Sequence, residues 1–164
     1  MMKTAYLQTA AGDRSIMTML ANDLSNLQEA VARSGTALEI DHALAPLIAH
    51  SDPSIITPIL RLLNESGDQD GMWSILHAAE SFEGSAYITG LLPALLDLSQ
   101  SCPWWTTTLI IRVINSDADK AELVRQLRTA ATPIKEAVSM ICKKINEDMR
   151  FHAKTAQVLA VAEN

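Results

Sequence analysis

The residues best suited to chemistry lie together in one stretch, DQDGMWSILHAAESFEG, at residues 68–84. Helical spacing of residues 70–80 would place several polar or aromatic residues along one stripe: Asp70, Trp73, His77 and Glu80. The apolar residues of the same segment fall on another side and should face the core: Met72, Ile75, Leu76 and Ala79. On such a helix His77 and Glu80 would be neighbours. They could therefore act as a base with its orienting acid, or as two metal ligands.

The sequence lacks the further residues that a metal site or a hydrolytic site would need. A zinc ion takes about three or four protein ligands, but this helix offers two, and the other histidines are isolated: His42, His50 and His152. A hydrolytic dyad also needs an activated nucleophile, and neither Ser74 nor Ser81 lies in a Gly-x-Ser-x-Gly turn. We therefore expect a protein that is not an enzyme and needs no metal or cofactor. Trp73 and His77 are then either core residues or part of a binding face.

Three further residues stand out from their apolar surroundings. Trp104 and Trp105 follow Pro103 at the expected start of a helix. Adjacent helical positions diverge by about 100°, so we expect at least one of the two indoles in the core. Arg112 lies within the apolar segment LIIRVINS. A guanidinium in such company must find a partner or reach solvent, and we predict an ion pair with an acid from the preceding helix pair.

Charge is distributed unevenly along the chain, whose net charge is −6. Residues 39–97 hold nine acids against one base, Arg61, which gives this segment a net charge of −8. A field of this sign repels nucleic acid and attracts basic partners. The bases of residues 120–154 are interleaved with acids at helical spacing, which is typical of a solvated face. We therefore expect a basic protein partner and no nucleic acid.

The elements that must position these residues are all expected to be helices. With 48% apolar but only 4% aromatic residues, packing rests on Leu, Ile, Ala and Met, which favours helices. No run alternates for long enough to be a strand. We expect eight or nine helices, over approximately 15–34, 40–48, 53–66, 71–81, 86–99, 104–116, 118–130, 133–145 and 151–159, with Asp52 and Asp117 as N-caps.

The helices also pair into a repeat. Residues 56–82 can be laid over residues 91–116, since each segment has a proline in its first helix, a polar turn, and a tryptophan near the start of its second helix. Pro58, Pro93 and Pro133 recur at intervals of 35 and 40 residues. Two helices per unit at this period are typical of HEAT-like repeats.

One domain over residues 1–164 accounts for the whole chain, with residues 1–14 as either a flexible segment or an additional helix. Cys102 and Cys142 belong to no CxxC pair, so we expect reduced thiols in a cytoplasmic protein.

The apolar residues 84–111 hold a single charge, but prolines interrupt them, so we expect two buried helices and no membrane span.

Four motifs within residues 70–116 carry a resemblance: GMWSILHAAESF, YITGLLPALLDL, PWW and RVINS. This stretch resembles the helical, HEAT-like immunity proteins of contact-dependent growth inhibition and related polymorphic toxin systems, the group called immunity protein 30. The resemblance implies an all-α fold, a right-handed superhelix of antiparallel helix pairs. It also implies a small cytoplasmic protein that binds one cognate toxin domain and blocks its active site.

Many toxins of these systems are nucleases and hence basic, which agrees with the acidity of residues 39–97. We expect the toxin to be contacted by five acids and one aromatic anchor: Asp68, Asp70, Trp73, Glu80, Glu83 and Asp97. Two alternatives stay open. The first is a general HEAT-like adaptor without a toxin partner. The second is a helical-repeat DNA glycosylase, which would need a basic groove that the charge distribution does not predict.

Overall fold

The computed structural model describes the backbone of residues 2–164 and the side chains of residues 16–164. This part of the chain contains nine α-helices, two short 3-10 helices and no strand. The helices are α1 (Met2–Ala32), α2 (Ala37–Ala49), α3 (Ile56–Leu60), α4 (Gln69–Glu80), α5 (Gly84–Leu98), α6 (Pro103–Asn115), α7 (Asp117–Leu127), α8 (Thr132–Ile145) and α9 (His152–Ala162). The all-α class is thereby confirmed. The backbone of residues 2–14 is continuous with the rest of α1, and flexibility of this segment stays a prediction.

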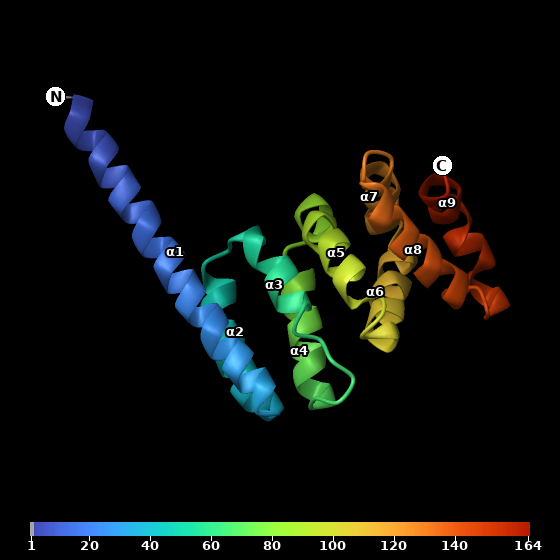
Figure 1. Cartoon of the computed structure of the whole chain (residues 1–164), viewed down its shortest axis with the longest axis horizontal. Coiled ribbons are helices and arrows are strands. Elements are labelled where there is room, and N and C mark those ends of the chain that lie inside the picture. Colours follow the sequence, from blue (N-terminus) through green and yellow to red (C-terminus); the bar gives the residue numbers. More distant parts are fainter. Residues whose placement is uncertain (1) are drawn as a thin grey trace.

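The helices alternate between two layers (Figure 1). In one layer α3, α5, α7 and α9 lie side by side, each in contact with the next. In the other layer α2 contacts α4 and α6 contacts α8, while α1 packs on α2. Contacts between the layers, such as those of α3 with α4 and of α6 with α7, enclose the core. A helix is therefore followed by its partner in the other layer and then by its neighbour in the same layer.

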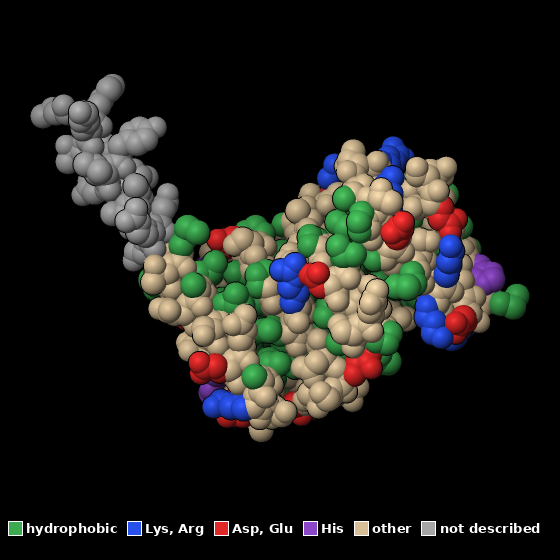
Figure 2. All heavy atoms as spheres, viewed as in Figure 1, with side chains coloured by type: hydrophobic (Ala, Val, Ile, Leu, Met, Phe, Trp, Pro, Cys, Tyr) green, Lys and Arg blue, Asp and Glu red, His purple; other side chains and the backbone are tan. Residues whose placement is uncertain are grey.

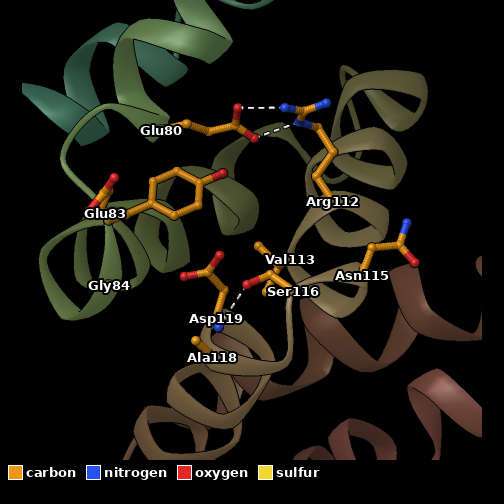
Figure 3. A pocket seen from close by; sticks show the side chains of 10 residues that line it. Glu80, Glu83, Gly84, Arg112, Val113, Asn115, Ser116, Ala118 and Asp119 are labelled. Carbon is orange, nitrogen blue, oxygen red and sulfur yellow. Dashed lines mark hydrogen bonds and ion pairs between the residues drawn. The ribbon is translucent and has the colours of Figure 1, made fainter.

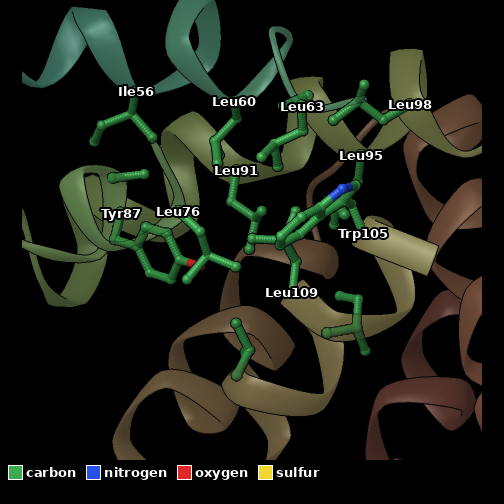
Figure 4. Close-up of a cluster of buried hydrophobic side chains, with 14 of the residues drawn as sticks. Ile56, Leu60, Leu63, Leu76, Tyr87, Leu91, Leu95, Leu98, Trp105 and Leu109 are labelled. Atoms are coloured by element: carbon green, nitrogen blue, oxygen red, sulfur yellow. The ribbon is translucent and has the colours of Figure 1, made fainter. Parts of the chain in front are cut away.

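The predicted apolar stripes face the space between the layers. Ile75 and Leu76 of α4, and Leu91 and Leu95 of α5, are fully buried. Figure 4 shows how side chains from four helices meet in this cluster: Ile56, Leu60, Leu76, Leu91, Leu95, Trp105 and Leu109. Each such side chain stabilises the fold by about 1.5–3 kcal/mol through burial, so the core itself fixes α4, α5 and α6 relative to one another.

The helix predicted over residues 53–66 is wrong in its second half. A 3-10 turn over Pro53–Ile55 leads into α3, which already ends at Leu60. Asn64 explains the early end, because its side chain donates to the carbonyl of Leu62 and accepts from the backbone N–H of Ser66. Such local bonds compete with the helical pattern. Leu63 is nevertheless buried, as the apolar pattern predicts.

The structure corrects two further predictions. Ser116, not Asp117, is the N-cap of α7, since its hydroxyl accepts from the N–H of Asp119. The prolines do not occupy matching places either. Pro93 lies inside α5, whereas Pro58 lies in the first turn of α3 and Pro133 in the first turn of α8. A first-turn N–H has no partner within its own helix, so these two prolines cost no hydrogen bond and do not mark a repeated bend.

Two sequence features need no special chemistry in the fold. Cys102 and Cys142 are both buried and form no disulfide. Residues 84–111 separate into α5 and α6, and among the described residues no helix has the length and hydropathy needed to cross a bilayer.

A glycine allows the closest approach between α3 and α5. A Cβ at Gly90 would lie 2.5 Å from the Cβ of Ile56, a distance that real side chains do not adopt. At the same place the hydroxyl of Thr57 donates to the carbonyl of Gly90 at 2.6 Å. The side chains of Ile56 and Thr57 on α3 therefore rest directly on the backbone of α5 at Gly90, and the packing of α3 on α5 depends on this small residue.

Gly90→Ala should destabilise the protein, although alanine is the better helix former by about 1 kcal/mol. The added methyl group meets the rigid Cβ of Ile56, and overpacking of this kind costs about 1–3 kcal/mol. We expect thermal unfolding followed by circular dichroism to show a Tm lower by roughly 2–6 °C.

Gly71→Ala is the matched control, since its methyl group would meet only the flexible end of Ile40. Its Tm should change less, and a Gly90→Ala protein that melts at or above the wild-type temperature would contradict the close contact of Ile56 with Gly90.

Candidate partner-binding site

The site begins at the start of α4, where Asp68 is the N-cap. Its carboxylate accepts from the backbone N–H of Gly71 at 3.0 Å, so this acid is used to begin the helix. Asp70 follows in the first turn, is exposed and forms no ion pair among the described residues. Negative charge in a first turn is favourable to the helix dipole. α4 thus starts with two acids, one of them free for a partner.

α4 and α6 run side by side in the same direction and are joined by large side chains. Trp73 of α4 contacts Trp105 of α6, with ring centroids 5.2 Å apart. Seven residues further along both helices, about 10 Å, Glu80 contacts Arg112. The offset of 32 residues is the same for both pairs. This pairing agrees with the sequence overlay, which placed Trp73 at the level of the tryptophans that follow Pro103.

The three tryptophans form one cluster at the first of these contacts. Trp105 is 2% exposed and donates from its indole N–H to the carbonyl of Asn64 at 3.0 Å. Trp104 is 47% exposed, and its ring meets that of Trp105 edge-on at 4.5 Å. Trp73 lies between them and the stacked ring of His77, 5.8 Å away. At least one indole of the pair is in the core, as predicted, and Trp73 is half-buried, with one edge on the core and one toward solvent.

Arg112 and Glu80 form the second contact. The guanidinium donates two hydrogen bonds to the carboxylate, at 2.5 and 2.7 Å, and its central carbon lies 5.8 Å from the ring of Trp73. The hydrogen bonds from Arg112 to Glu80 hold the pKa of the guanidinium above its ordinary value. The predicted ion pair with an acid of the preceding helix pair is therefore present, and it crosses from α6 to α4.

A pocket of about 840 Å³ opens beside this ion pair (Figure 3). It is lined from the end of α4, the start of α5, the end of α6 and the start of α7: Glu80, Glu83, Gly84, Tyr87, Arg112, Val113, Asn115, Ser116, Ala118 and Asp119. Three acids thus face one base. Glu80 and Arg112 neutralise each other, whereas Glu83 and Asp119 form no ion pair with any described residue.

Glu83 occupies an unusual backbone position at the rim of this pocket. Its φ is +51°, and Gly84 follows at φ +53°. A non-glycine residue in this region is strained by about 1–3 kcal/mol. The turn between α4 and α5 therefore presents the Glu83 side chain in a conformation that the surrounding structure has to enforce.

The structure brings only some of the predicted contact residues together. Trp73, Glu80 and Glu83 lie along the α4–α6 contact and its pocket. Asp68 and Asp70 lie at the opposite end of α4, about 15 Å from Glu80 by helical rise. Asp97 lies apart, on α5, where it accepts from Arg61 at 2.5 Å. Two of the five acids, Glu80 and Asp97, are thus bonded to a base of the same chain.

Sequence reasoning missed two residues of the pocket, Tyr87 and Asp119, and underrated Trp104 outside it. Tyr87 is 3% exposed, and its hydroxyl is buried without a hydrogen-bond partner in the described structure. The sequence pattern does not mark Asp119 as a contact residue, and it does not say which of Trp104 and Trp105 is the exposed indole. One signal was available for Tyr87, because it stands four residues after Glu83 and so on the same side of a helix. Nothing in the sequence links either residue to Asp119.

The groups that could do chemistry in this region are occupied. The hydroxyls of Ser74 and Ser81 donate to backbone carbonyls of their own helix. His77 lies 3.4 Å from the Glu80 carboxylate, which also accepts the hydrogen bonds of Arg112. Burial raises the pKa of Cys142 to about 12 and also raises that of Cys102, which keeps both thiols protonated. No group of three or more metal-binding side chains occurs in the searched part of the chain.

A double-mutant cycle should detect the bond between α4 and α6. Glu80→Gln, Arg112→Gln and their combination should give a coupling energy of about 0.5–1 kcal/mol at low salt, falling as salt is added, since the pair is partly exposed. Urea unfolding of the four proteins measures it.

In the control cycle Glu136→Gln, a change at an exposed acid on α8, replaces Glu80→Gln and should give no coupling to Arg112. Equal values in the two cycles would mean that the Glu80–Arg112 pair contributes nothing.

Comparison with known proteins gives one match. The model of the family described as immunity protein 30 matches residues 28–123, more than half of the chain, and so includes α2 to α6 and most of α7. No curated protein and no solved structure matches. The match extends the resemblance noted over residues 70–116 in both directions and includes the whole α4–α6 contact. Proteins of this family are non-enzymatic and bind toxins, and this chain belongs to the immunity protein 30 family.

Proposed function

We propose that this immunity protein neutralises a basic, nuclease-type toxin domain by covering its active site in a 1:1 complex. Its membership of the immunity protein 30 family assigns toxin neutralisation, and the proposal concerns the kind of toxin and the means. One observation carries it. Two acids that form no ion pair with any described residue, Asp70 and Glu83, lie at the two ends of α4, and the aromatic cluster lies between them.

The charge of the region supports a basic partner. Residues 39–97 have a net charge of −8, and only Arg61 among them is basic. An acidic surface of this strength steers a cationic protein and raises its association rate by about 10- to 1,000-fold at low salt. A nuclease is basic where it holds the nucleic-acid backbone, so the surface that attracts this immunity protein would be the catalytic one.

The aromatic cluster supports tight binding beyond steering. Interfaces are anchored by a few tryptophan, tyrosine and arginine side chains in their centre. Trp104 is 47% exposed although its ring rests on Trp105, and so it is large, rigid and held in place before binding. Pre-ordered aromatics lose little entropy on binding, which makes Trp104 and the solvent-facing edge of Trp73 suitable anchors.

The proposed contact residues stay the six that the sequence nominated: Asp68, Asp70, Trp73, Glu80, Glu83 and Asp97. These residues differ in whether they are ion-paired within the chain. Asp70 and Glu83 offer full charges, whereas Glu80 and Asp97 share theirs with Arg112 and Arg61. We expect the free acids to act on the association rate and Trp73 to act on the dissociation rate.

We also propose the wider setting. The two alternating layers are compatible with a HEAT-like, right-handed superhelix of helix pairs forming one domain over residues 1–164. The toxin would belong to a contact-dependent growth inhibition system, and neutralisation would take place in the cytoplasm, where such a toxin arrives. A general adaptor, the alternative, would bind proteins but protect no cell from a toxin.

Co-expression tests the function directly. Cells that produce the toxin domain encoded directly upstream of this gene should survive only when this chain is also produced. If they die equally with and without it, the proposed neutralisation is wrong. With purified proteins, one equivalent of this chain should stop nucleic-acid cleavage, and added substrate should compete with it. A neutralised toxin that cleaves no nucleic acid would remove the nuclease part of the proposal.

The steering argument predicts a change in association rate. The double substitution Asp70→Lys and Glu83→Lys should lower kon for the toxin by about tenfold at low salt and flatten its salt dependence, because both acids are free. Asp68 is left intact, since its loss would also remove the cap of α4.

Glu136→Lys, the reversal of an exposed acid on α8, serves as the control and should behave like wild type. Stopped-flow traces that are identical for wild type and the double variant across salt would refute the steering.

A further inference from the structure

The pocket between α4, α5, α6 and α7 contains one buried polar atom without a partner. Tyr87 is only 3% exposed, and its hydroxyl is inaccessible to solvent. This hydroxyl makes no hydrogen bond with any described residue. A buried polar group left unpaired costs free energy, and a group that enters and pairs with this hydroxyl would recover that cost. Tyr87 lines the pocket while its hydroxyl is covered, so a group that enters there would reach the hydroxyl once the covering side chains move apart.

The charges around Tyr87 define what can enter. Burial raises the pKa of this tyrosine, the Glu80 and Asp119 carboxylates raise it further, and the Arg112 guanidinium lowers it. The hydroxyl therefore stays neutral, and its oxygen is available as an acceptor. Two carboxylates, Glu83 and Asp119, remain unpaired among the described residues, and Figure 3 shows both beside the pocket, with the Glu80–Arg112 pair across from Asp119. The lining thus has a net charge of −2.

We propose that this pocket receives one arginine or lysine side chain of the toxin. The proposal rests on the function proposed above and names the contact that would fix the complex. The cationic head would form an ion pair with Glu83 and Asp119 and donate a hydrogen bond to the hydroxyl oxygen of Tyr87. Arg112 keeps its bonds to Glu80, which prevents it from neutralising the pocket from within. A volume of about 840 Å³ is ample for one side chain and its backbone.

Three conservative variants test the pocket in the full chain: Tyr87→Phe, Glu83→Gln and Asp119→Asn. Each should weaken toxin binding by roughly tenfold, the usual effect of losing one hydrogen bond or ion pair to a charged group. Tyr87→Phe is the sharpest, because the free protein loses no hydrogen bond with the hydroxyl. Its Tm should equal or exceed that of wild type while its Kd rises. Glu136→Gln, with its carboxylate on α8, should bind within about twofold of wild type.

The partner supplies a reciprocal test. Among variants of the toxin in which single arginine and lysine residues are replaced by alanine, one should show coupling with both Glu83→Gln and Tyr87→Phe in double-mutant cycles. If wild type binds the toxin and the three pocket variants bind it equally well, the pocket proposal is overturned while the proposed function stands.

A small cationic probe tests whether the pocket binds a guanidinium group when no toxin is present. N-acetyl-arginine amide should bind only at millimolar concentration and shift the NMR signals of residues at the pocket, and its neutral citrulline analogue should not. Micromolar binding of the free probe would assign the pocket to a small cation instead of the toxin. If wild type fails to bind the toxin, the proposed function fails, and absence of any probe binding would then overturn the pocket as a cation site as well.

Discussion

The contact between α4 and α6 is the constraint on which the candidate partner-binding site depends. These two helices lie in the same layer and are joined by large side chains. Trp73 rests on Trp105 near the start of both helices, and Glu80 holds Arg112 toward the end. Two contacts about 10 Å apart fix both the spacing and the register of the helices. Packed indoles and a two-point ion pair have few alternative arrangements, so the surface above them is rigid before any partner arrives.

The same contact decides how charge is presented. Arg112 would be the one base of the pocket, and a free guanidinium there would cancel an acid. Because Arg112 is bonded to Glu80, the two neutralise each other, and Glu83 and Asp119 keep their charge. The strained turn at Glu83 and the first turn of α7 at Asp119 then bring acids from two separate helix pairs to one place. For the basic toxin that we propose as the partner, this arrangement would favour binding, since pre-ordered charge loses little entropy on binding.

Much of the fold could be predicted from the sequence, because helices depend on local spacing. The apolar stripe of Ile75 and Leu76 is buried as expected, and Arg112 has the ion pair that its apolar surroundings required. The errors arose where side chains compete locally with the helix. Asn64 ends the segment that the apolar pattern would have continued, and Ser116 takes the cap assigned to Asp117. A one-residue choice between two capping side chains is decided by backbone angles that the sequence pattern does not specify.

By itself the sequence determined that this protein is all-α, that its middle is acidic, and that it resembles the immunity protein 30 family, which the family match confirms. The first two properties follow from composition and from spacings of three or four residues along one chain, and the resemblance rests on the four motifs within residues 70–116. Only the tertiary structure decided which acids are free. Asp97 and Glu80 are bonded to bases 36 and 32 residues away in sequence, whereas Glu83 and Asp119 lie at one pocket with the unpartnered Tyr87 hydroxyl. Such pairings depend on how whole helices pack, and the packing is the sum of many buried contacts that no short stretch of sequence contains.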